Sequence, residues 1–145
     1  MGEQEAIQVA RRGVEAFNAA DWGALSADLT TDSVYEEPAT GRRLGGIEEI
    51  LAADKGWKAA FPDAKGTITN ELACGNTAVL EITWQGTQSG DLVAPMGTIP
   101  ATGRSVTIKA VQVVEVENGK AMSNRHYFDM ASMLAQLGVG TPATA

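Results

Sequence analysis

The sequence lacks the features that mark several large classes of protein. Cys74 is the only cysteine among 145 residues, so no internal disulfide can form and no thiol cluster is available for zinc or an iron–sulfur centre. The lysines and arginines form no long basic stripe, and the formal net charge is −7, which argues against a nucleic-acid partner. Apolar runs are far shorter than a membrane span, and the N-terminus has no secretory signal pattern. We therefore expect a cytoplasmic protein that binds neither nucleic acid nor membranes.

Short motifs for nucleotide, phosphate and metal chemistry are also missing. The sequence contains no GxGxxG dinucleotide motif, Walker loop, GxSxG elbow or HExxH zinc helix. Any catalysis is therefore predicted to need no cofactor and no metal ion. No internal repeat or linker divides the chain, so we expect one domain over residues 1–145, with residues 139–145 as a flexible tail.

Hydrophobic spacing predicts four helices. Apolar residues recur at intervals of three and four, which lines one face of a helix, and Asp21 and Asp129 stand where N-caps are expected. Pro62 and Gly138 are typical stop signals for the third and the last helix. The four helices are expected over residues 3–18, 22–29, 47–61 and 130–137.

Strands are predicted where the pattern alternates with a period of two. A brief strand is expected at Val34 and Tyr35, and Gly75-Asn76 and Asn118-Gly119 are turn signals that join longer strands into antiparallel hairpins. The longer strands are expected over residues 68–74, 78–85, 104–117 and 120–128. Residues 86–103 are expected to form a long loop at the lip of a pocket. The order of elements indicates an α+β domain in which helices and a bent sheet enclose an apolar pocket for a small hydrophobic organic ligand.

Polar residues on otherwise apolar strand faces are the candidates for chemistry, because burying them costs free energy unless they are paired or used. His126 is the only histidine and is the candidate general base, although a satisfied or solvent-facing histidine is an equal alternative. Asp129 either caps the last helix, reaches the pocket rim or orients His126. Gln112, Asn70 and Tyr35 are candidate donors to an enolate oxygen, with polar satisfaction of the core as the alternative.

Bulky and acidic residues complete the candidate site. Asp54 interrupts the apolar stripe of the third helix and either projects into the cavity or marks the edge of the stripe. Glu36 and Glu37 are neighbours on a strand and should point to opposite faces, so a mechanism with two carboxylates is not expected. Cys74 is expected to fill the inner face of its strand. The residues expected to wall the pocket, or else to form plain core, are Phe17, Trp22, Trp57, Phe61, Trp84 and Met96.

Several short motifs resemble those of a known family, the SnoaL-like polyketide cyclases, also called ester cyclases, of the nuclear-transport-factor-2-like superfamily. The resemblance covers nearly the whole chain. The matching segments are ValTyrGluGluPro at 34–38, AlaAlaPhePro at 59–62, ProAlaThrGlyArg at 100–104, GluAsnGlyLys at 117–120, ArgHisTyrPheAsp at 125–129 and GlnLeuGly at 136–138.

The resemblance implies a cone-shaped α+β barrel (NTF2-like, cystatin-like), with helices in the concave face of a bent, mainly antiparallel sheet. It implies a homo-oligomer, either dimer or tetramer, and a cofactor-free intramolecular aldol condensation in which a base removes a proton next to a carbonyl. The family commonly has an aspartate where this chain has His126, and it places polar pocket residues at the position of Gln112. The same fold also suggests an epoxide hydrolase, a ketosteroid-isomerase-like enzyme or a non-catalytic binding module.

Overall fold

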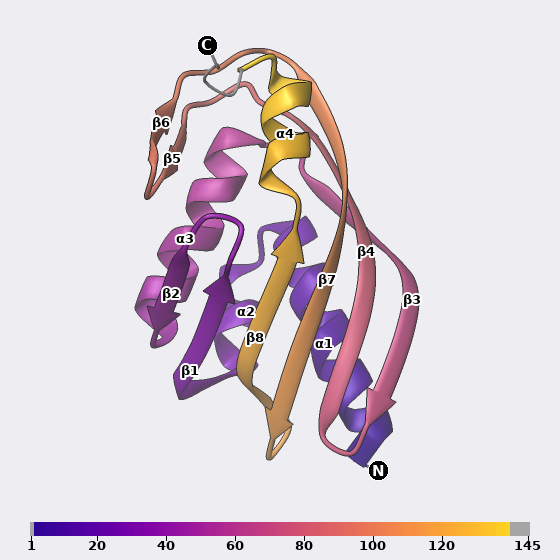
Figure 1. Ribbon diagram of the computed structural model, residues 1–145. Helices are drawn as coiled ribbons and strands as arrows, with labels where there is room; N and C mark the ends of the chain where they lie inside the picture. The colour runs from indigo at the N-terminus through magenta and orange to yellow at the C-terminus, as the bar shows by residue number, and fades with distance from the viewer. Residues whose placement is uncertain (1, 140–145) are drawn as a thin grey trace.

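A bent six-stranded sheet and four helices form the computed structural model, which describes residues 2–139 (Figure 1). The strand order is β2-β1-β8-β7-β4-β3, and neighbouring strands are antiparallel except β1 and β8, which are parallel. The helices are α1 (Gly2–Ala19), α2 (Trp22–Ala27), α3 (Ile47–Ala60) and α4 (Met130–Leu137). The strands are β1 (Leu29–Glu37), β2 (Arg42–Gly45), β3 (Lys65–Cys74), β4 (Thr77–Thr87), β5 (Leu92–Ala94), β6 (Gly97–Ile99), β7 (Ser105–Glu117) and β8 (Lys120–Phe128).

Helix α1 lies in the concave face of the sheet and forms one of two apolar clusters with it. Val9 and Val14 of α1 pack in a cluster with Leu80, Ile82 and Val114, all at most 3% exposed. The second cluster joins α4 and the end of α3 to those ends of β4 and β7 that lie away from the first cluster. Trp84 of β4 packs against both clusters, so it lies at the level where the two halves of the core meet.

The predicted helices are confirmed with one shorter than expected. Asp21 caps α2, since its carboxylate accepts a hydrogen bond from the Ala24 amide at 3.1 Å, but α2 ends at Ala27 and Leu29 already begins β1. The brief strand expected at Val34 and Tyr35 is therefore nine residues long. Strand β2, which the sequence pattern did not predict, pairs with the C-terminal end of β1.

A β-bulge in β3 reverses the face that its alternation predicted. The register with β4 shifts between Ile68 and Asn70, so residues after the bulge point to the opposite side from the one that strict alternation assigns. Asn70, Leu72 and Cys74 are consequently exposed, and Leu72 is 54% accessible. The predictions that Asn70 faces the pocket and that Cys74 fills the inner face are therefore wrong.

The segment expected as a loop over residues 86–103 contains regular structure. Strand β4 continues to Thr87, and β5 and β6 form a small hairpin beside α3 (Figure 1). The fully buried Gln88 ties the two ends of this segment together, because its side-chain amide donates to the Ile99 carbonyl at 2.9 Å while its oxygen accepts from Thr102. A polar side chain thus supplies hydrogen bonds that a short loop backbone cannot make by itself.

The C-terminal end of the described chain follows its sequence signals. Asp129 caps α4 by accepting from the Ala131 amide at 3.0 Å, and Gly138 ends the helix in the left-handed conformation at φ 74°. Val139 still donates its amide to the Leu134 carbonyl. The rest of the tail predicted over 139–145 lies outside the described residues. Within residues 2–139, no helix combines the length and the apolarity needed to cross a membrane.

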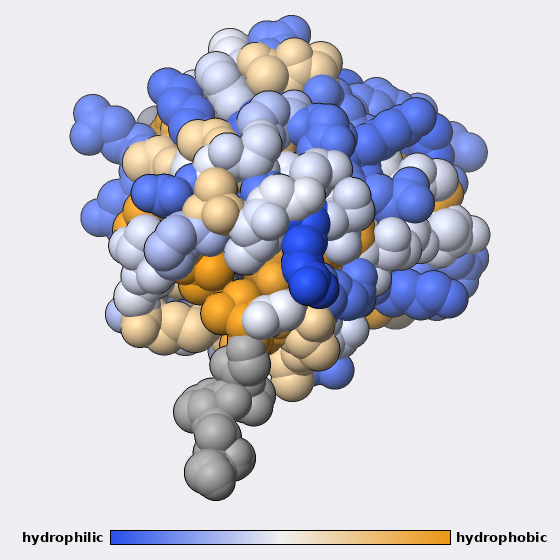
Figure 2. Space-filling model, turned by 90° about the horizontal axis from the view of Figure 1, so that it is seen from above, coloured by the Kyte–Doolittle hydropathy of each residue, from blue (hydrophilic) through white to orange (hydrophobic). Residues whose placement is uncertain are grey.

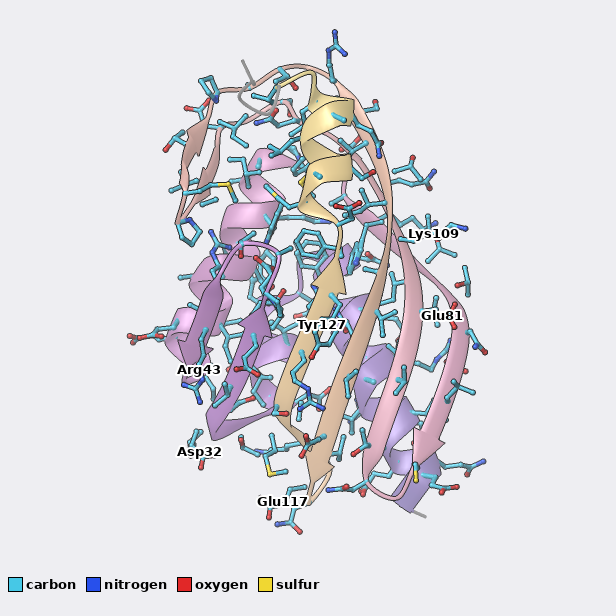
Figure 3. The ribbon with its side chains drawn as sticks, in the orientation of Figure 1. Asp32, Arg43, Glu81, Lys109, Glu117 and Tyr127 are labelled. Carbon is cyan, nitrogen blue, oxygen red and sulfur yellow. The ribbon has the colours of Figure 1, made fainter. Side chains whose placement is uncertain are left out.

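The outer face of the sheet carries no helix within the described residues. Figure 3 labels Glu81, Lys109 and Tyr127, three exposed side chains that alternate along β4, β7 and β8 with inward-facing core residues. Val111 and Val113 lie on the same outer face and are half-buried. The homo-oligomer implied by the family resemblance stays a prediction.

A pair of leucine substitutions tests the bulge and the position of the core. We expect Leu80→Ala to lower the free energy of unfolding by about 2–5 kcal/mol, because it leaves a cavity at a site with no exposure. Leu72→Ala, on the neighbouring strand, should change it by less than about 0.5 kcal/mol, because its side chain already faces solvent. Urea denaturation measures both values, and equal losses would contradict the register described for β3.

Candidate active site

A cavity of about 140 Å³ lies between α1, α3 and the concave face of the sheet. That volume is close to the ~150 Å³ of an engineered apolar cavity that holds benzene. Most of the lining is apolar and aromatic. The aromatic residues that line it are Phe17, Tyr35, Trp57, Phe61, Trp84 and Phe128. Seen from the end of the molecule, apolar side chains also reach the surface within a polar surround (Figure 2).

Four polar residues on adjacent strands interrupt this apolar wall. Gln112 of β7 and His126 of β8 are cross-strand partners, and Asn124 lies two residues before His126 on the same face. Tyr35 of β1 is the register partner of Asn124. Pairing between strands distant in sequence thus brings the polar residues into one patch on the sheet side of the cavity.

The ring of His126 is held at both nitrogens. The Trp84 indole N–H donates to Nε2 at 3.1 Å, and an indole nitrogen can only donate, so Nε2 carries no proton. The proton of the neutral ring is therefore on Nδ1, from which it is donated to the Tyr35 hydroxyl oxygen at 2.9 Å. This arrangement fixes a single tautomer of His126.

A buried carboxylate, Glu37, completes the chain of hydrogen bonds. Tyr35 donates its hydroxyl proton to Glu37 Oε2 at 2.6 Å, and the Trp57 indole donates to the same oxygen at 3.1 Å. Glu37 Oε1 accepts from the Thr40 hydroxyl at 2.6 Å and has the Arg42 guanidinium at 3.8 Å. Three hydrogen-bond donors and one guanidinium therefore compensate a carboxylate with no exposure to solvent.

The environment of His126 weakens its prediction as the general base. Burial lowers the pKa of His126 to about 4, because no anion contacts the ring to stabilise its charged form. To accept a proton, the ring would have to break the bond from Trp84 as well. His126 therefore faces the cavity, as predicted. It does so as a neutral histidine whose two ring nitrogens are both hydrogen-bonded.

The pKa of Asp54 is shifted in the opposite direction from that of His126. Asp54 projects from α3 into the cavity, and burial together with the negative charge of Glu37 raises its pKa to about 7, while Arg42 offsets part of that rise. Among the described residues no side chain donates a hydrogen bond to the Asp54 carboxyl. A carboxyl group that exchanges its proton near neutrality is suited to general acid–base catalysis.

Two side-chain amides in the polar patch retain hydrogen-bonding capacity. Among residues 2–139, Gln112 makes no side-chain hydrogen bond although it is only 9% exposed, and Asn124 Oδ1 is buried without a partner. Buried polar groups are normally paired, so an unpaired amide at a cavity is a place where a ligand or water can bind. Amide N–H groups can donate to an oxygen that gains negative charge.

Gly66 of β3 explains how Trp84 reaches His126. It is the cross-strand partner of Trp84, and a Cβ atom at position 66 would lie 2.6 Å from the indole ring. Glycine therefore lets the ring lie directly over the β3 backbone and directs its N–H toward the histidine. The ring also packs edge-on against Phe17, at a centroid distance of 5.3 Å.

Other residues predicted for the site lie outside it. Asn70 follows the β3 bulge and bonds Glu81 on the outer face, and Met96 is 53% exposed at the turn between β5 and β6. Asp129 is exposed and caps α4, so it neither lines the cavity nor orients His126. Trp22 packs edge-on against Phe17 behind the cavity wall. The pocket predictions for Asn70 and Met96 are therefore wrong, whereas for Asp129 the alternative of a helix cap holds and for Trp22 that of plain packing.

Sequence reasoning gave too little weight to Glu37, Asp54 and Asn124. The opposite orientation of Glu36 and Glu37 was correct, but it is the burial of Glu37 that matters. A charge that interrupts an apolar helical stripe, as Asp54 does, was the available signal. No group of three or more His, Cys, Asp or Glu residues within the described range is arranged to hold a metal ion.

Comparison with known proteins identifies the family. The family model described as SnoaL-like polyketide cyclase matches residues 7–137, so the chain belongs to the SnoaL-like polyketide cyclase family. No curated protein matches the sequence. The family predicted from the short motifs is therefore confirmed.

Solved structures agree with this assignment. A protein proposed to be a SnoaL-like polyketide cyclase from Jannaschia sp. CCS1 superposes with a TM-score of 0.85 at 17% identity, covering 97% of this chain and 96% of that one. IdmH, a proposed polyketide cyclase from Streptomyces antibioticus, gives 0.77 at 27% identity over 92% and 99%. An epoxide hydrolase of the LEH-like type from M. tuberculosis gives 0.73 at 22% identity over 95% and 92%. The predicted cone-shaped fold is confirmed.

Two buried titrations predict an unusual dependence of stability on pH. Below pH 6.5 the unfolded chain protonates His126 but the folded protein does not until about pH 4, which lowers stability as the pH falls. Over the same range the folded protein keeps a proton on Asp54, which the unfolded chain releases above pH 3.8, and this raises stability as the pH falls. The contributions of the two groups should therefore nearly cancel between pH 6.5 and 4.

Asp54→Asn removes one of the two opposing titrations. In this variant the free energy of unfolding should fall by up to about 3 kcal/mol between pH 6.5 and 4, the equivalent of the His126 shift. Urea denaturation at a series of pH values measures it, with Asp32→Asn, an exposed aspartate, as the control. A variant whose pH dependence matches that of the wild type would show that Asp54 is not protonated in the folded protein.

Proposed function

We propose that this protein is a cofactor-free acid–base enzyme of the cyclase type, with Asp54 as the general base. The observation that carries the proposal is an aspartate with a pKa of about 7 in an apolar, aromatic cavity, facing a patch of polar side chains. At neutral pH about half of such carboxyl groups are ionised and able to remove a proton. Asp54 replaces His126 in the role first expected for the histidine.

The reaction follows from what the two sides of the cavity offer. Asp54 removes a proton from the carbon next to a substrate carbonyl, and the electron pair of the broken C–H bond moves onto the carbonyl oxygen as an enolate. The N–H groups of Gln112 and Asn124 donate hydrogen bonds to that oxygen. The enolate carbon then attacks a second carbonyl of the same molecule, and the alkoxide formed takes back the proton from Asp54.

The cavity also limits the substrate class. An apolar, aromatic lining and a volume of about 140 Å³ accommodate a hydrophobic portion of about one ring, so a larger substrate has to extend beyond the enclosed space. The proposed substrate is a small hydrophobic carbonyl compound, or the ring-forming end of a longer one. Family membership and the similarity to the proposed cyclase IdmH support this class.

Proton exchange provides a test that does not require the natural substrate. Wild-type protein in D₂O should accelerate deuterium incorporation next to the carbonyl of acetophenone or cyclohexanone, measured by proton NMR. The rate should rise with pH and level off above about 7, because the reactive form of Asp54 is the carboxylate. Asp54→Asn should lower it at least ~100-fold.

The matched control is Glu48→Gln, which also exchanges a carboxylate for an amide on α3 but at an exposed position. Its exchange rate should equal that of the wild type. If Asp54→Asn retained the wild-type rate while remaining folded, Asp54 would not be the base. A protein that binds these ketones without exchanging their protons would instead support the non-catalytic binding module.

Epoxide opening is the second candidate, and the partly protonated state of Asp54 favours it. In that reaction the Asp54 carboxyl donates a proton to the epoxide oxygen as the C–O bond breaks, water forms the new bond to carbon, and the proton that this water loses returns through solvent to the Asp54 carboxylate. The solved epoxide hydrolase of the same fold supports the class. The two candidates predict opposite pH profiles, since the acid form of Asp54 is lost above about pH 7. Diol formation from limonene oxide that declines above neutral pH would favour this reaction over the cyclase.

A further inference from the structure

We propose that Glu37 is a positioning residue: its buried carboxylate sets the proton direction of the Trp84–His126–Tyr35 chain and thereby decides which cavity groups can donate to a ligand. This inference deepens the proposed function and rests on it for the identity of the ligand. The geometry of Glu37 itself is independent of any reaction.

The Glu37 side chain is the acceptor in every hydrogen bond that it makes within residues 2–139. Tyr35 and Trp57 donate to one carboxylate oxygen, and Thr40 donates to the other, which also faces Arg42. Tyr35 belongs to β1, Trp57 to α3 and Arg42 to β2, and Thr40 lies in the turn between β1 and β2. Each oxygen of the Glu37 carboxylate thus accepts at least one hydrogen bond.

The two ends of the hydrogen-bond chain determine the direction of its protons. Glu37 forces Tyr35 to donate to it, so the Tyr35 oxygen can only accept from His126 Nδ1. At the other end the Trp84 indole forces His126 Nε2 to accept. Every proton along the chain therefore points toward Glu37.

The consequence concerns the ligand. Tyr35 and His126 have already used their donor protons within the chain, so neither can donate to a bound oxygen without breaking a bond at 2.6 or 2.9 Å. Within residues 2–139 neither the Gln112 nor the Asn124 side chain makes a hydrogen bond, so their amide N–H groups are left as the donors of the polar patch. The site therefore selects a ligand with its carbonyl oxygen at the two amides and its acidic carbon toward Asp54.

Glu37 also acts on Asp54 through its charge. The titratable groups that act on Asp54 or line the cavity with it from the sheet are Glu37 and Tyr35 of β1, Arg42 of β2 and His126 of β8. Asp28 also lines the cavity, but Arg12 pairs with it. Helix α1 contributes only apolar residues to the lining. Glu37 is therefore the nearby anion that disfavours the ionised form of Asp54.

The experiment is nuclear magnetic resonance of the ligand-free protein. Side-chain nitrogen and proton resonances report the tautomer of His126 and its bond to Tyr35, and the carboxyl carbon resonance of Asp54 reports its titration. In Glu37→Gln the Asp54 midpoint should fall by at least about 0.5 pH unit, because a negative charge is removed while the shape is kept. The His126 Nδ1 proton resonance should shift as well.

Two further variants separate the roles of charge and hydrogen bonding. Glu36→Gln changes the adjacent residue, which faces away and pairs with Arg43 at 3.5 Å, and should leave both readouts unchanged. Tyr35→Phe keeps the Glu37 charge but interrupts the chain, so the His126 resonance should change strongly while the Asp54 midpoint moves less than it does in Glu37→Gln.

A folded Glu37→Gln protein with an unchanged Asp54 midpoint and an unchanged His126 resonance overturns the inference. If that variant does not fold, Tyr35→Phe decides, and an unaltered His126 Nδ1 proton there overturns the proposed direction of the chain. Both readouts are taken without substrate, so a failed exchange assay would count against Asp54 as the base and leave this result standing.

Discussion

The buried carboxylate of Glu37 is the interaction on which the polar side of the cavity depends. A charge taken out of water is costly unless donors surround it, and here donors from β1, the turn after it, β2 and α3 converge on its two oxygens. The same contacts join an edge of the sheet to the helix that carries Asp54. The position of α3 relative to β1 and the geometry of the site are therefore linked through the Glu37 side chain.

The site combines two opposite effects of burial. Burial of His126 favours its neutral form, and burial of Asp54 favours the protonated acid, so the two groups carry less charge near neutrality than their types suggest. The pKa of Asp54 is close enough to neutral pH for its carboxyl to exchange a proton, whereas the pKa of His126 is too low. The histidine is thus a neutral hydrogen-bonding group in this structure, whereas the Asp54 carboxyl can exchange its proton near neutral pH.

Much of the fold follows from local sequence signals. The stripe of α1, the caps at Asp21 and Asp129 and the Asn118-Gly119 turn act over a few residues, so the sequence reveals them directly. The inner face of β7 alternates without interruption from Val106 to Val116, which placed Gln112 in the cavity correctly. The family motifs extended this to the cone-shaped fold.

The sequence by itself determined the four helices, the long strands, the family and the presence of Gln112, Tyr35 and His126 in the cavity, because periodicity and short motifs carry that information. Only the tertiary structure decided that Asn70 faces outward, since a bulge shifts register without altering composition. It also decided the hydrogen-bond partners of His126 and Glu37 and the position of Asp54 at the cavity. The pKa values of His126 and Asp54 depend on burial, and the Tyr35 partner of His126 lies 91 positions away in sequence, which no local pattern records.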